Sequence, residues 1–315
     1  MPPKFGRHGR YSLSLPLVLV LALLTFGQVH SATTAARSSH TALVDYTYGQ
    51  GYVEAGANGG VYAFGNAHFW GSIFNYSPGG ETSQQWFGVP MVGIADTSGN
   101  SGYWTTTSTA MVCGFGSAVV YYNQNASHST AWCFTSWNGL SNIVGVTADP
   151  VNSGYWLVGS DGGVFSFGGA PYAGNALGQG VTIVAMAATP DGGGYWLVAS
   201  NGAIYAFGSA LYSGGMNGQS LNKPIVGIAS GPNDSSYWLV GGDGGVFNFG
   251  GVPQYGSLGG TALYYNIEGI ASTRDQQGFY LMAFDGSVLT YGDAQFQGDL
   301  YGNSTYGQIA GIAYT

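Results

Sequence analysis

Positive charge is nearly absent from this sequence. Of its 315 residues only six are lysine or arginine, and three of those six lie within the first ten positions. The chain beyond Ser31 carries three cations against fourteen carboxylates, a net charge of −11 with histidine neutral. Nucleic acids and anionic lipids are bound by clustered cations that displace counterions. The composition therefore excludes a nucleic-acid partner and an electrostatic membrane partner, and it disfavours polyanionic ligands.

Cysteine is almost as scarce, and the only two residues, Cys113 and Cys133, are twenty positions apart. For a chain that leaves the reducing cytosol a disulfide is the simplest pairing, and closing a loop of that length contributes about 3 kcal/mol. A structural zinc site would require four ligands, and His128 is the only histidine close to the pair. We therefore predict a disulfide between the two cysteines, with no metal site and no cofactor.

Long apolar runs are also missing, apart from one near the N-terminus. Three cations precede an apolar stretch over residues 13–26, and small residues follow between positions 31 and 36. This order is typical of a secretory signal peptide, and the stretch is short for a membrane span. We predict that residues 1–36 are a signal peptide with a short tail. The mature chain is then secreted, to the extracellular space or the cell wall, without membrane insertion. An uncleaved signal anchor is the alternative.

Glycine and aromatic residues are abundant, and they recur in a fixed pattern. The segment Gly-Tyr-Trp-Leu-Val at 154–158 returns at 194–198, and related segments occupy 236–240, 278–282 and, in weaker form, 102–104 and 51–53. The first aromatic residue of each copy marks one unit: Tyr52, Tyr103, Tyr155, Tyr195, Tyr237 and Phe279. Spacings of 51, 52, 40, 42 and 42 residues separate these markers, so the chain contains six units. Repeats of this length indicate solenoids, propellers or arrays.

Each unit has the pattern of short antiparallel strands. Twelve positions after every marker an aromatic residue precedes glycine, and six positions after it lies a polar residue that precedes glycine in every unit except at Thr109. Asn-Gly and Asp-Gly pairs favour tight hairpin turns. In the fifth unit the predicted strands are residues 225–229, 237–240 and 245–249, with a short fourth strand around 252–255. Four such strands in about 42 residues are typical of one blade of a β-propeller.

The two ends of the repeated region complement each other. Residues 309–313 copy the first strand of a unit, and with Ile312 in that role the next marker would fall at position 321, a spacing of 42 from Phe279. Tyr52 can supply that missing marker. We therefore predict an all-β fold: residues 37–315 form a single six-bladed β-propeller of four-stranded antiparallel blades, closed by the C-terminal strand. Residues 41–48 are a rival first strand.

The repeat itself resembles a known group. The pattern GYWLVxSDGGVFxFG, followed by VxIxAxAATPDGGGYW, is similar to repeats of secreted actinobacterial proteins, well over residues 142–315 and loosely over residues 42–141. In that family the repeats often accompany cell-wall hydrolase domains such as amidases or lysozyme-like enzymes. The resemblance implies a location at the cell wall. This sequence shows no separate catalytic domain, so the hydrolase activity of those neighbours does not carry over.

Catalytic signals are weak. A sialidase holds its substrate carboxylate with three arginines, and the mature chain has two, one of them in the N-terminal tail. A glycosidase requires two carboxylates at a suitable separation, and the candidates outside the repeated turns include Asp45, Glu54, Glu81, Asp96 and Glu268. We expect Glu54 at an edge or solvent-facing strand position. The sequence does not bring any two of these carboxylates together.

Histidines and the repeated aspartates have simpler interpretations than catalysis. His40, His68 and His128 lie outside any GxSxG context, and we expect His68 at the surface. The repeated aspartates precede glycine without a DxDxDG loop around them: Asp161, Asp243 and Asp285. We interpret them as turn residues, with calcium binding as the alternative.

Aromatic residues divide into those that follow the repeat and those that break it. We interpret the repeated ones as packing between units, because each buries roughly 150–250 Å². The others cluster in the extended first and second units, and we predict that they form an aromatic wall that binds the ligand: Tyr76 and Trp86, with Tyr121, Tyr122, Trp132, Phe134 and Trp137 around the proposed disulfide. Alternatively, these extensions only cap irregular units.

The functional hypothesis is a secreted, monomeric, non-catalytic binding module of the bacterial surface or cell wall. Its ligand would be a neutral glycan, peptidoglycan or a protein partner, since tyrosine and tryptophan present flat amphipathic faces and the surface carries little charge. One alternative is a polysaccharide or cell-wall hydrolase with carboxylates at the mouth of the propeller channel. A structural surface protein is the other.

Overall fold

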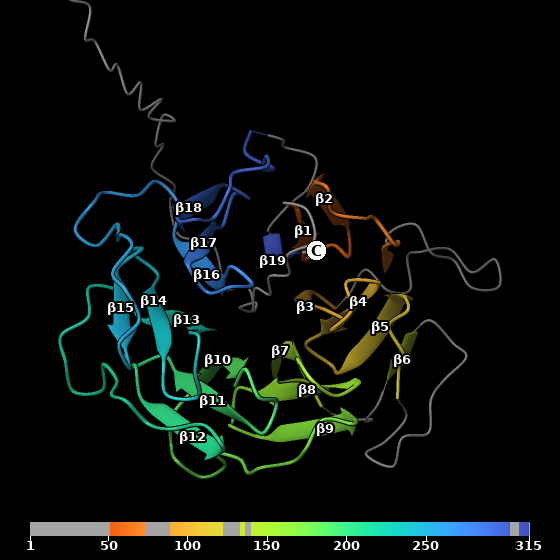
Figure 1. The fold of residues 1–315 in the computed structure, drawn as a ribbon, viewed down its shortest axis with the longest axis horizontal. Helices are drawn as coiled ribbons and strands as arrows, with labels where there is room; N and C mark the ends of the chain where they lie inside the picture. The colour runs from red at the N-terminus through yellow and green to blue at the C-terminus, as the bar shows by residue number, and fades with distance from the viewer. Residues whose placement is uncertain (1–50, 74–88, 122–132, 136–139, 303–308, 315) are drawn as a thin grey trace, which may run out of the picture.

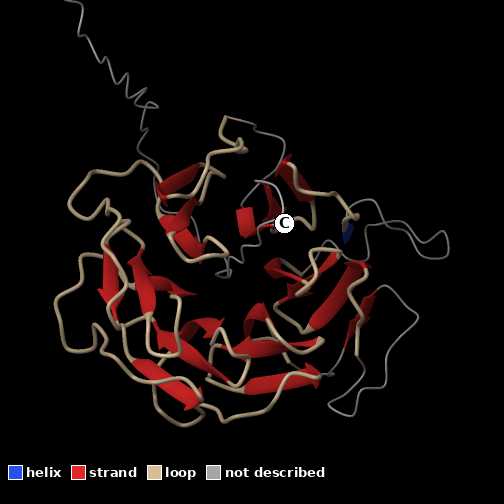
Figure 2. Cartoon of the chain, in the orientation of Figure 1, coloured by secondary structure: helices blue, strands red, loops and turns tan. Residues whose placement is uncertain are grey.

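The computed structural model describes residues 51–73, 89–121, 133–135, 140–302 and 309–314. This part of the chain consists of β-strands in six antiparallel sheets, with no α-helix in these ranges. The sheets surround a common centre (Figure 1), and loops and turns join their strands (Figure 2). The predicted all-β class is confirmed.

Each sheet corresponds to one unit of the repeat. Sheet 1 contains β19 (Ile309–Tyr314), β1 (Gly51–Gly56) and β2 (Val61–Gly65), and sheet 2 contains β3 (Met91–Asp96), β4 (Gly102–Thr107), β5 (Met111–Gly116) and β6 (Cys133–Thr135). Sheet 3 contains β7 (Ile143–Ala148), β8 (Gly154–Gly159) and β9 (Val164–Gly168), and sheet 4 contains β10 (Ile183–Ala188), β11 (Gly194–Ala199) and β12 (Ile204–Gly208). Sheet 5 contains β13 (Ile225–Ser230), β14 (Tyr237–Gly241) and β15 (Val246–Phe249), and sheet 6 contains β16 (Ile267–Ser272), β17 (Gly278–Ala283) and β18 (Val288–Gly292).

The turn between the second and third strands has the chemistry that the sequence indicates. Between β8 and β9, the backbone N–H of Gly163 donates to the Asp161 carboxylate at 3.0 Å, and Gly162 takes a left-handed φ of +90°. The same hydrogen bond recurs at four further turns, where a backbone N–H two positions later donates to the side-chain oxygen of Asn58, Asn201, Asp243 or Asp285. The repeated aspartates are therefore turn residues, as predicted.

The first strands of the sheets contact one another in a closed circuit. β3 contacts β7, and the sequence of contacts continues through β10, β13, β16 and β19 back to β3. Glycine permits this close approach, because a Cβ on Gly93 would lie 2.9 Å from the backbone nitrogen of Val146 on the neighbouring first strand. A larger residue at position 93 would push sheets 2 and 3 apart.

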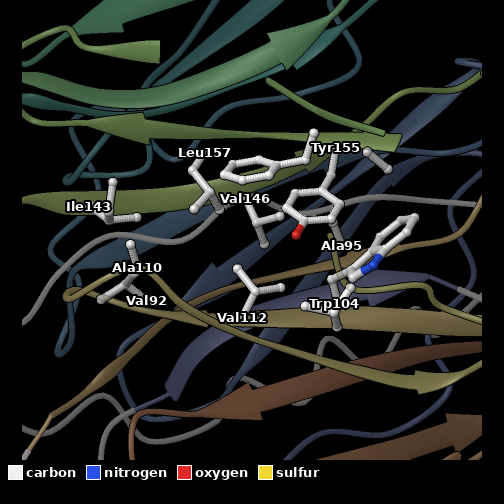
Figure 3. Packing of buried hydrophobic residues seen from close by; sticks show 12 residues of the cluster. Val92, Ala95, Trp104, Ala110, Val112, Ile143, Val146, Tyr155 and Leu157 are labelled. Carbon is white, nitrogen blue, oxygen red and sulfur yellow. The ribbon is translucent and has the colours of Figure 1, made fainter. Parts of the chain in front are cut away.

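The hydrophobic core lies between sheets. Six clusters of buried residues each join two neighbouring sheets, including sheets 6 and 1. Figure 3 shows the cluster between sheets 2 and 3, where Trp104 of β4 lies against Tyr155 of β8 with ring centroids 5.1 Å apart. All six marker aromatics are fully buried in such clusters. Their interpretation as packing between units is confirmed.

The two ends of the repeated region meet in sheet 1. β1 pairs in antiparallel fashion with β19, in a register that places Tyr52 opposite Tyr314, and also with β2. The predicted pairing of the C-terminal strand with the first unit is confirmed. The rival segment, residues 41–48, lies outside the described residues.

The predicted fourth strand is wrong for five sheets, which have three strands each as described. Residues 252–255 are irregular, and so are their equivalents in the other units. In the five sheets with three strands we use the name rim segments for the four residues that begin sixteen positions after the marker: residues 68–71, 171–174, 211–214, 253–256 and 295–298. Backbone groups of the rim segments form hydrogen bonds with side chains, and the rim segments do not pair with the third strand of their sheet.

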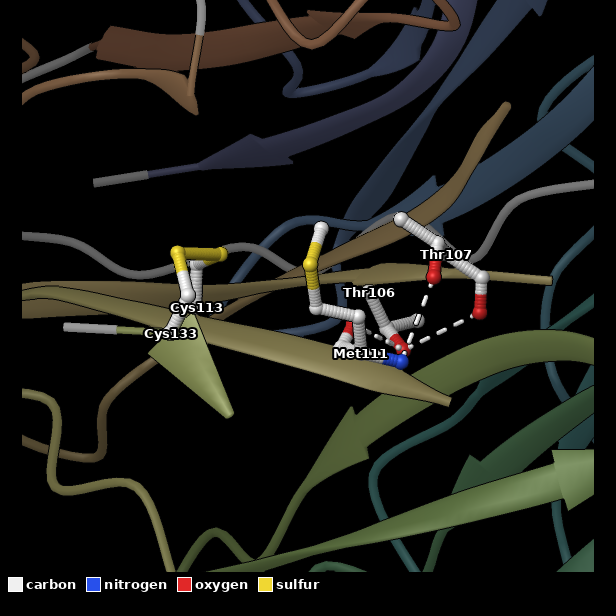
Figure 4. Close-up of a disulfide and its surroundings, with 5 residues drawn as sticks. All are labelled: Thr106, Thr107, Met111, Cys113 and Cys133. Carbon is white, nitrogen blue, oxygen red and sulfur yellow. Dashed lines mark hydrogen bonds between the residues drawn. A yellow bond between two sulfur atoms is a disulfide. The ribbon is translucent and has the colours of Figure 1, made fainter. Parts of the chain in front are cut away.

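Sheet 2 has a fourth strand in another place. β6 pairs with β5, so that Cys113 lies directly opposite Cys133, and the two form the predicted disulfide. Figure 4 shows this bridge beside the Thr107–Met111 turn, in which the Met111 N–H donates to the Thr107 hydroxyl at 3.2 Å. The bridge therefore attaches the edge strand β6 to the rest of sheet 2.

Candidate functional site

Tryptophans fix the first residue of the rim segments. The indole N–H of Trp156 donates to the Pro171 carbonyl at 2.8 Å, and that of Trp196 donates to the Leu211 carbonyl at 2.9 Å. Trp238 makes the same bond to Pro253, fifteen residues along the chain. Each of these three tryptophans is buried in its own sheet, so the rim segments 171–174, 211–214 and 253–256 are tied to the units that contain them.

Marker tyrosines of the following sheet fix the last two residues of the rim segments. The Tyr195 hydroxyl donates to the Gly174 carbonyl at 2.6 Å and accepts the backbone N–H groups of Ala173 at 3.1 Å and Gly174 at 3.0 Å. The Tyr237 hydroxyl accepts the Ser213 N–H at 3.0 Å and donates to the Gly214 carbonyl at 2.7 Å. One hydroxyl thereby replaces the strand partner that these backbone groups lack.

The side chain of the second residue is exposed in every rim segment, both in 171–174 and 211–214, which are held at both ends, and in 68–71 and 295–298, which the marker tyrosine alone holds. Four of these five side chains are aromatic and exposed: Phe69 at 44%, Tyr172 at 54%, Tyr212 at 66% and Phe296 at 56%, while sheet 5 has Gln254 there. An exposed aromatic at one fixed position in four units is not explained by packing. These four residues, the rim aromatics, form the first candidate site.

A pocket of about 250 Å³ is the second candidate site. It opens where the first strands of sheets 3 to 6 end, close to the centre of the circuit. Buried apolar side chains such as Met186 and Ile228 line it together with serine and threonine hydroxyls, and Arg274 and Gln276 belong to the wall contributed by sheet 6. None of the described residues that line the pocket is aspartate, glutamate or histidine.

Two carboxylates lie deep in the fold. Glu54 is fully buried on the middle strand of sheet 1, which contradicts the expected edge or solvent-facing position. The pairing of β1 with β19 covers the face that an edge strand would expose. Burial, together with the smaller effect of the negative charges of Asp299 and Asp285, raises the pKa of Glu54 to about 9. The pKa of the fully buried Asp96 rises to about 8, because burial outweighs the hydrogen bond from the Thr97 N–H.

Buried carboxylates of this kind cannot act on a polymer. Glu54 and Asp96 have no solvent-accessible surface, so no polysaccharide reaches either of them. Glu268 is half-buried on β16. Asp45 and Glu81, the remaining candidates, lie outside the described residues.

Most of the predicted aromatic wall also lies outside the described residues: Tyr76, Trp86, Tyr122, Trp132 and Trp137. The backbone of Phe134 belongs to β6, opposite Val112. Tyr121 is half-buried and packs against Tyr155, with ring centroids 6.2 Å apart. The ligand site around the disulfide therefore stays a prediction.

The sequence contains a signal for the rim aromatics. The second residue of each rim segment is seventeen positions after a marker and two positions before a glycine, and it is aromatic in four cases. The repeat pattern predicts that recurring aromatics are buried, whereas these four are exposed. Their exposure depends on the irregular backbone of the rim segments, which sequence spacing alone does not reveal.

Other expectations concern the surface. His68 is exposed, as predicted, and its ring lies 4.1 Å from that of Trp70. Within the described ranges no three acidic, histidine or cysteine side chains are grouped to hold a metal ion. No helix there is long and apolar enough to cross a membrane.

Neither the models of known protein families nor the curated proteins yield a match to this chain.

Proposed function

We propose that the protein is a secreted, monomeric, non-catalytic binding module of the bacterial surface or cell wall, and that its ligand is a neutral glycan bound by the rim aromatics. The observation that carries this proposal is the exposure of Phe69, Tyr172, Tyr212 and Phe296 at one repeat position. Planar aromatic faces with few charges around them suit the apolar faces of sugar rings.

The rigidity of the rim segments supports binding. Tyr172 and Tyr212 lie between a carbonyl held by tryptophan and backbone N–H groups held by tyrosine. A side chain on such a backbone loses little conformational freedom when a ligand binds, so more of the contact energy appears as affinity. The Tyr172 hydroxyl also accepts a hydrogen bond from Asn175 at 2.5 Å, which orients the ring.

The architecture that we propose for this module is a six-bladed β-propeller, in which each sheet is one blade. Two observations support it: the closed circuit of first-strand contacts, and a hydrophobic cluster at every one of the six boundaries between sheets. A propeller presents equivalent segments of successive blades around its circumference, as a repeated binding surface requires.

No observation in the described part of the chain favours the hydrolase alternative. A glycosidase requires two reachable carboxylates. The central pocket has none among its described lining residues, and Glu54 and Asp96 are inaccessible.

The test is retention of the mature protein, residues 37–315, on insoluble cellulose, xylan, chitin and isolated peptidoglycan, with released sugar measured in parallel. We expect retention without release. The double substitution Tyr172→Ala and Tyr212→Ala should weaken retention roughly tenfold, because each aromatic contact contributes about 0.5–1.5 kcal/mol.

Tyr301→Ala is the matched control, since Tyr301 is a comparably exposed tyrosine outside the rim segments, and we expect it to bind as the unmodified protein does. Absence of retention on all four polymers would rule out a glycan ligand. Unchanged retention of the double variant would remove the rim aromatics from the binding surface, and sugar release would restore the hydrolase alternative.

A further inference from the structure

The rim aromatics fall into two pairs on opposite sides of the molecule. Tyr172 and Tyr212 belong to the neighbouring sheets 3 and 4, and we call them the tyrosine pair. Phe296 and Phe69 belong to sheets 6 and 1, which are also neighbours, and we call them the phenylalanine pair. In the closed circuit of contacts, sheet 5 separates the two pairs on one side and sheet 2 on the other. Figure 1 shows sheets 3 and 4 across the centre from sheets 6 and 1.

The two separating sheets have no exposed aromatic at the equivalent position. Sheet 5 has Gln254 there, and its side-chain amide donates to the Gly256 carbonyl at 3.4 Å. Sheet 2 has Val120 there, seventeen positions after its marker, and only 2% of this residue is exposed. Neither residue offers a planar face to a sugar ring. The run of exposed aromatics around the circuit is therefore interrupted twice.

The tyrosine pair is held by a single sheet. The Tyr195 hydroxyl bonds to residues 173–174, and the adjacent Trp196 donates its indole N–H to the Leu211 carbonyl at 2.9 Å. Two consecutive residues of β11 thus hold the two rim segments that carry the pair. Because both segments are attached to one strand, the two tyrosine rings keep a fixed spacing. A ligand that spans both rings meets a preformed surface.

The phenylalanine pair flanks sheet 1 in the corresponding way, with fewer bonds. Tyr52 of β1 donates its hydroxyl proton to the Gly298 carbonyl, and Tyr103 of β4 accepts the backbone N–H groups of residues 70–71 at 3.2 and 3.1 Å. No tryptophan follows the marker in sheet 1 or sheet 6. Phenylalanine also lacks a hydroxyl that could donate to a sugar. The tyrosine pair should therefore bind a glycan more tightly than the phenylalanine pair.

One stiff glycan chain cannot occupy both pairs. An extended polymer is nearly straight over a few sugar rings, so it follows two neighbouring positions of a ring and then departs from the circumference. The pair on the opposite side of the circuit is then open to another chain. Two sites that cannot hold the same chain bridge two chains.

We propose that each monomer has two separate glycan-binding sites, the tyrosine pair and the phenylalanine pair, and that it cross-links two chains of a neutral polysaccharide. This proposal rests on the proposed function, because it assigns the same residues and the same class of ligand. It adds that binding is bivalent. A monomer of this kind joins polymer chains without self-association.

The test is a capture experiment with residues 37–315. The protein is bound to insoluble cellulose, xylan, chitin or peptidoglycan, unbound protein is washed away, and a fluorescently labelled soluble fragment of the same polymer is added. The fragments are cellohexaose, xylohexaose, chitohexaose and glycan strands freed from peptidoglycan by an amidase. A bivalent chain holds the polymer at one site and captures the labelled fragment at the other. A chain with one site would instead be displaced from the polymer by the fragment.

Calorimetry with the same fragments gives the number of sites. We expect two ligands per chain for at least one fragment, with affinities that differ roughly threefold or more. The double variant Tyr172→Ala, Tyr212→Ala and the double variant Phe69→Ala, Phe296→Ala should each bind one ligand per chain and lose capture. Both should keep the melting temperature within about 2 °C, because the substituted side chains are exposed. Tyr301→Ala is the control and should keep two ligands and full capture.

The outcomes separate this proposal from the function on which it rests. Retention on a polymer with one ligand per chain and no capture would overturn bivalency and leave the binding module intact. Capture that persists in both double variants would place the two sites elsewhere and overturn the assignment to the pairs. Absence of retention on all four polymers would overturn the glycan ligand itself, and bivalency with it.

Discussion

A single hydroxyl joins neighbouring sheets at several boundaries. The marker Tyr195 contributes its ring to the cluster between sheets 3 and 4, and its hydroxyl satisfies three backbone groups of residues 173–174. Phe279 occupies the marker position of sheet 6 without a hydroxyl. The ring is therefore required at every boundary, whereas the hydroxyl is required where the rim segment must be held in place.

Removal of that hydroxyl should cost stability. We expect Tyr195→Phe to lower the free energy of unfolding by about 1–3 kcal/mol, because partly buried backbone donors and an acceptor lose their partner. Denaturant unfolding measures the change. Tyr205→Phe is the control: Tyr205 is half-buried, its hydroxyl makes no hydrogen bond with the described residues, and a change below about 0.5 kcal/mol is expected. Equal losses in the two variants would show that the hydroxyl of Tyr195 does not hold residues 173–174.

Glu54 makes stability depend on pH. Neither of its carboxyl oxygens has a hydrogen-bond partner among the described residues, and the pKa in the folded protein is about 9 against 4.5 for an exposed glutamate. The folded chain therefore binds one more proton than the unfolded chain between these two values. The free energy of unfolding must then fall as the pH rises from about 4.5 to 9, since the unfolded state releases a proton that the folded state retains.

Glu54→Gln tests this dependence, because the amide stays neutral at every pH. We expect the variant to melt at a higher temperature than the unmodified protein at pH 8, with a difference that shrinks towards pH 5. Glu268→Gln makes the same change in formal charge on the half-buried side chain of β16 and should preserve the original pH profile. If Glu54→Gln and the unmodified protein lost stability in parallel between pH 5 and 8, Glu54 would not be the responsible group.

At the scale of the element, the strands and their turns were predictable from local chemistry. A marker aromatic, a polar residue with glycine six positions later, and an aromatic with glycine twelve positions later specify one hairpin without reference to other units. The rim segments were not predictable in this way. Their apolar residues suggest a strand, but Pro253 has no N–H for a ladder, and its carbonyl bonds to Trp238. The irregular conformation thus depends on partners outside the segment.

The disulfide between β5 and β6 belongs to the same scale. We expect reduction to lower the melting temperature by roughly 5–10 °C, since closing a loop of twenty residues contributes about 3 kcal/mol. Circular dichroism should show the β structure retained at 25 °C, because the bridge joins two strands of the same sheet, sheet 2.

The double variant Cys113→Ala, Cys133→Ala controls for effects of the reductant elsewhere, and its melting temperature should not respond to reduction. Loss of the β signal on reduction would mean that the bridge supports more than one sheet.

For the whole molecule, the decisive contact is the one between the ends of the repeated region. β19 pairs with β1 and also contacts β3 and β16, so it completes one sheet and two boundaries between sheets. The spacing of the markers predicted this pairing, because the last unit ends just before its marker. The central pocket had no such signal: residues that follow the first strands of five sheets line it, from Ser98 to Gln276, and only the three-dimensional arrangement brings them to one cavity.

Deletion of residues 309–315 should open the molecule. We expect the truncated chain to lose its cooperative thermal transition, to bind a hydrophobic dye, and to self-associate in size-exclusion chromatography through the unpaired β1. Deletion of residues 37–48, which include the rival first strand, should leave the melting curve unchanged. If deletion of residues 37–48 abolished the cooperative transition and deletion of residues 309–315 did not, the N-terminal segment would be the strand that completes sheet 1.

The pairing of β1 with β19 also sets a condition on biosynthesis. The ribosome makes β1 before β19, and Tyr314 lies 262 positions after its partner Tyr52. A translation product that stops early, however many sheets it contains, keeps an unpaired strand edge that proteases and chaperones recognise. Synthesis must therefore proceed through β19 before sheet 1 and its two boundaries can be completed.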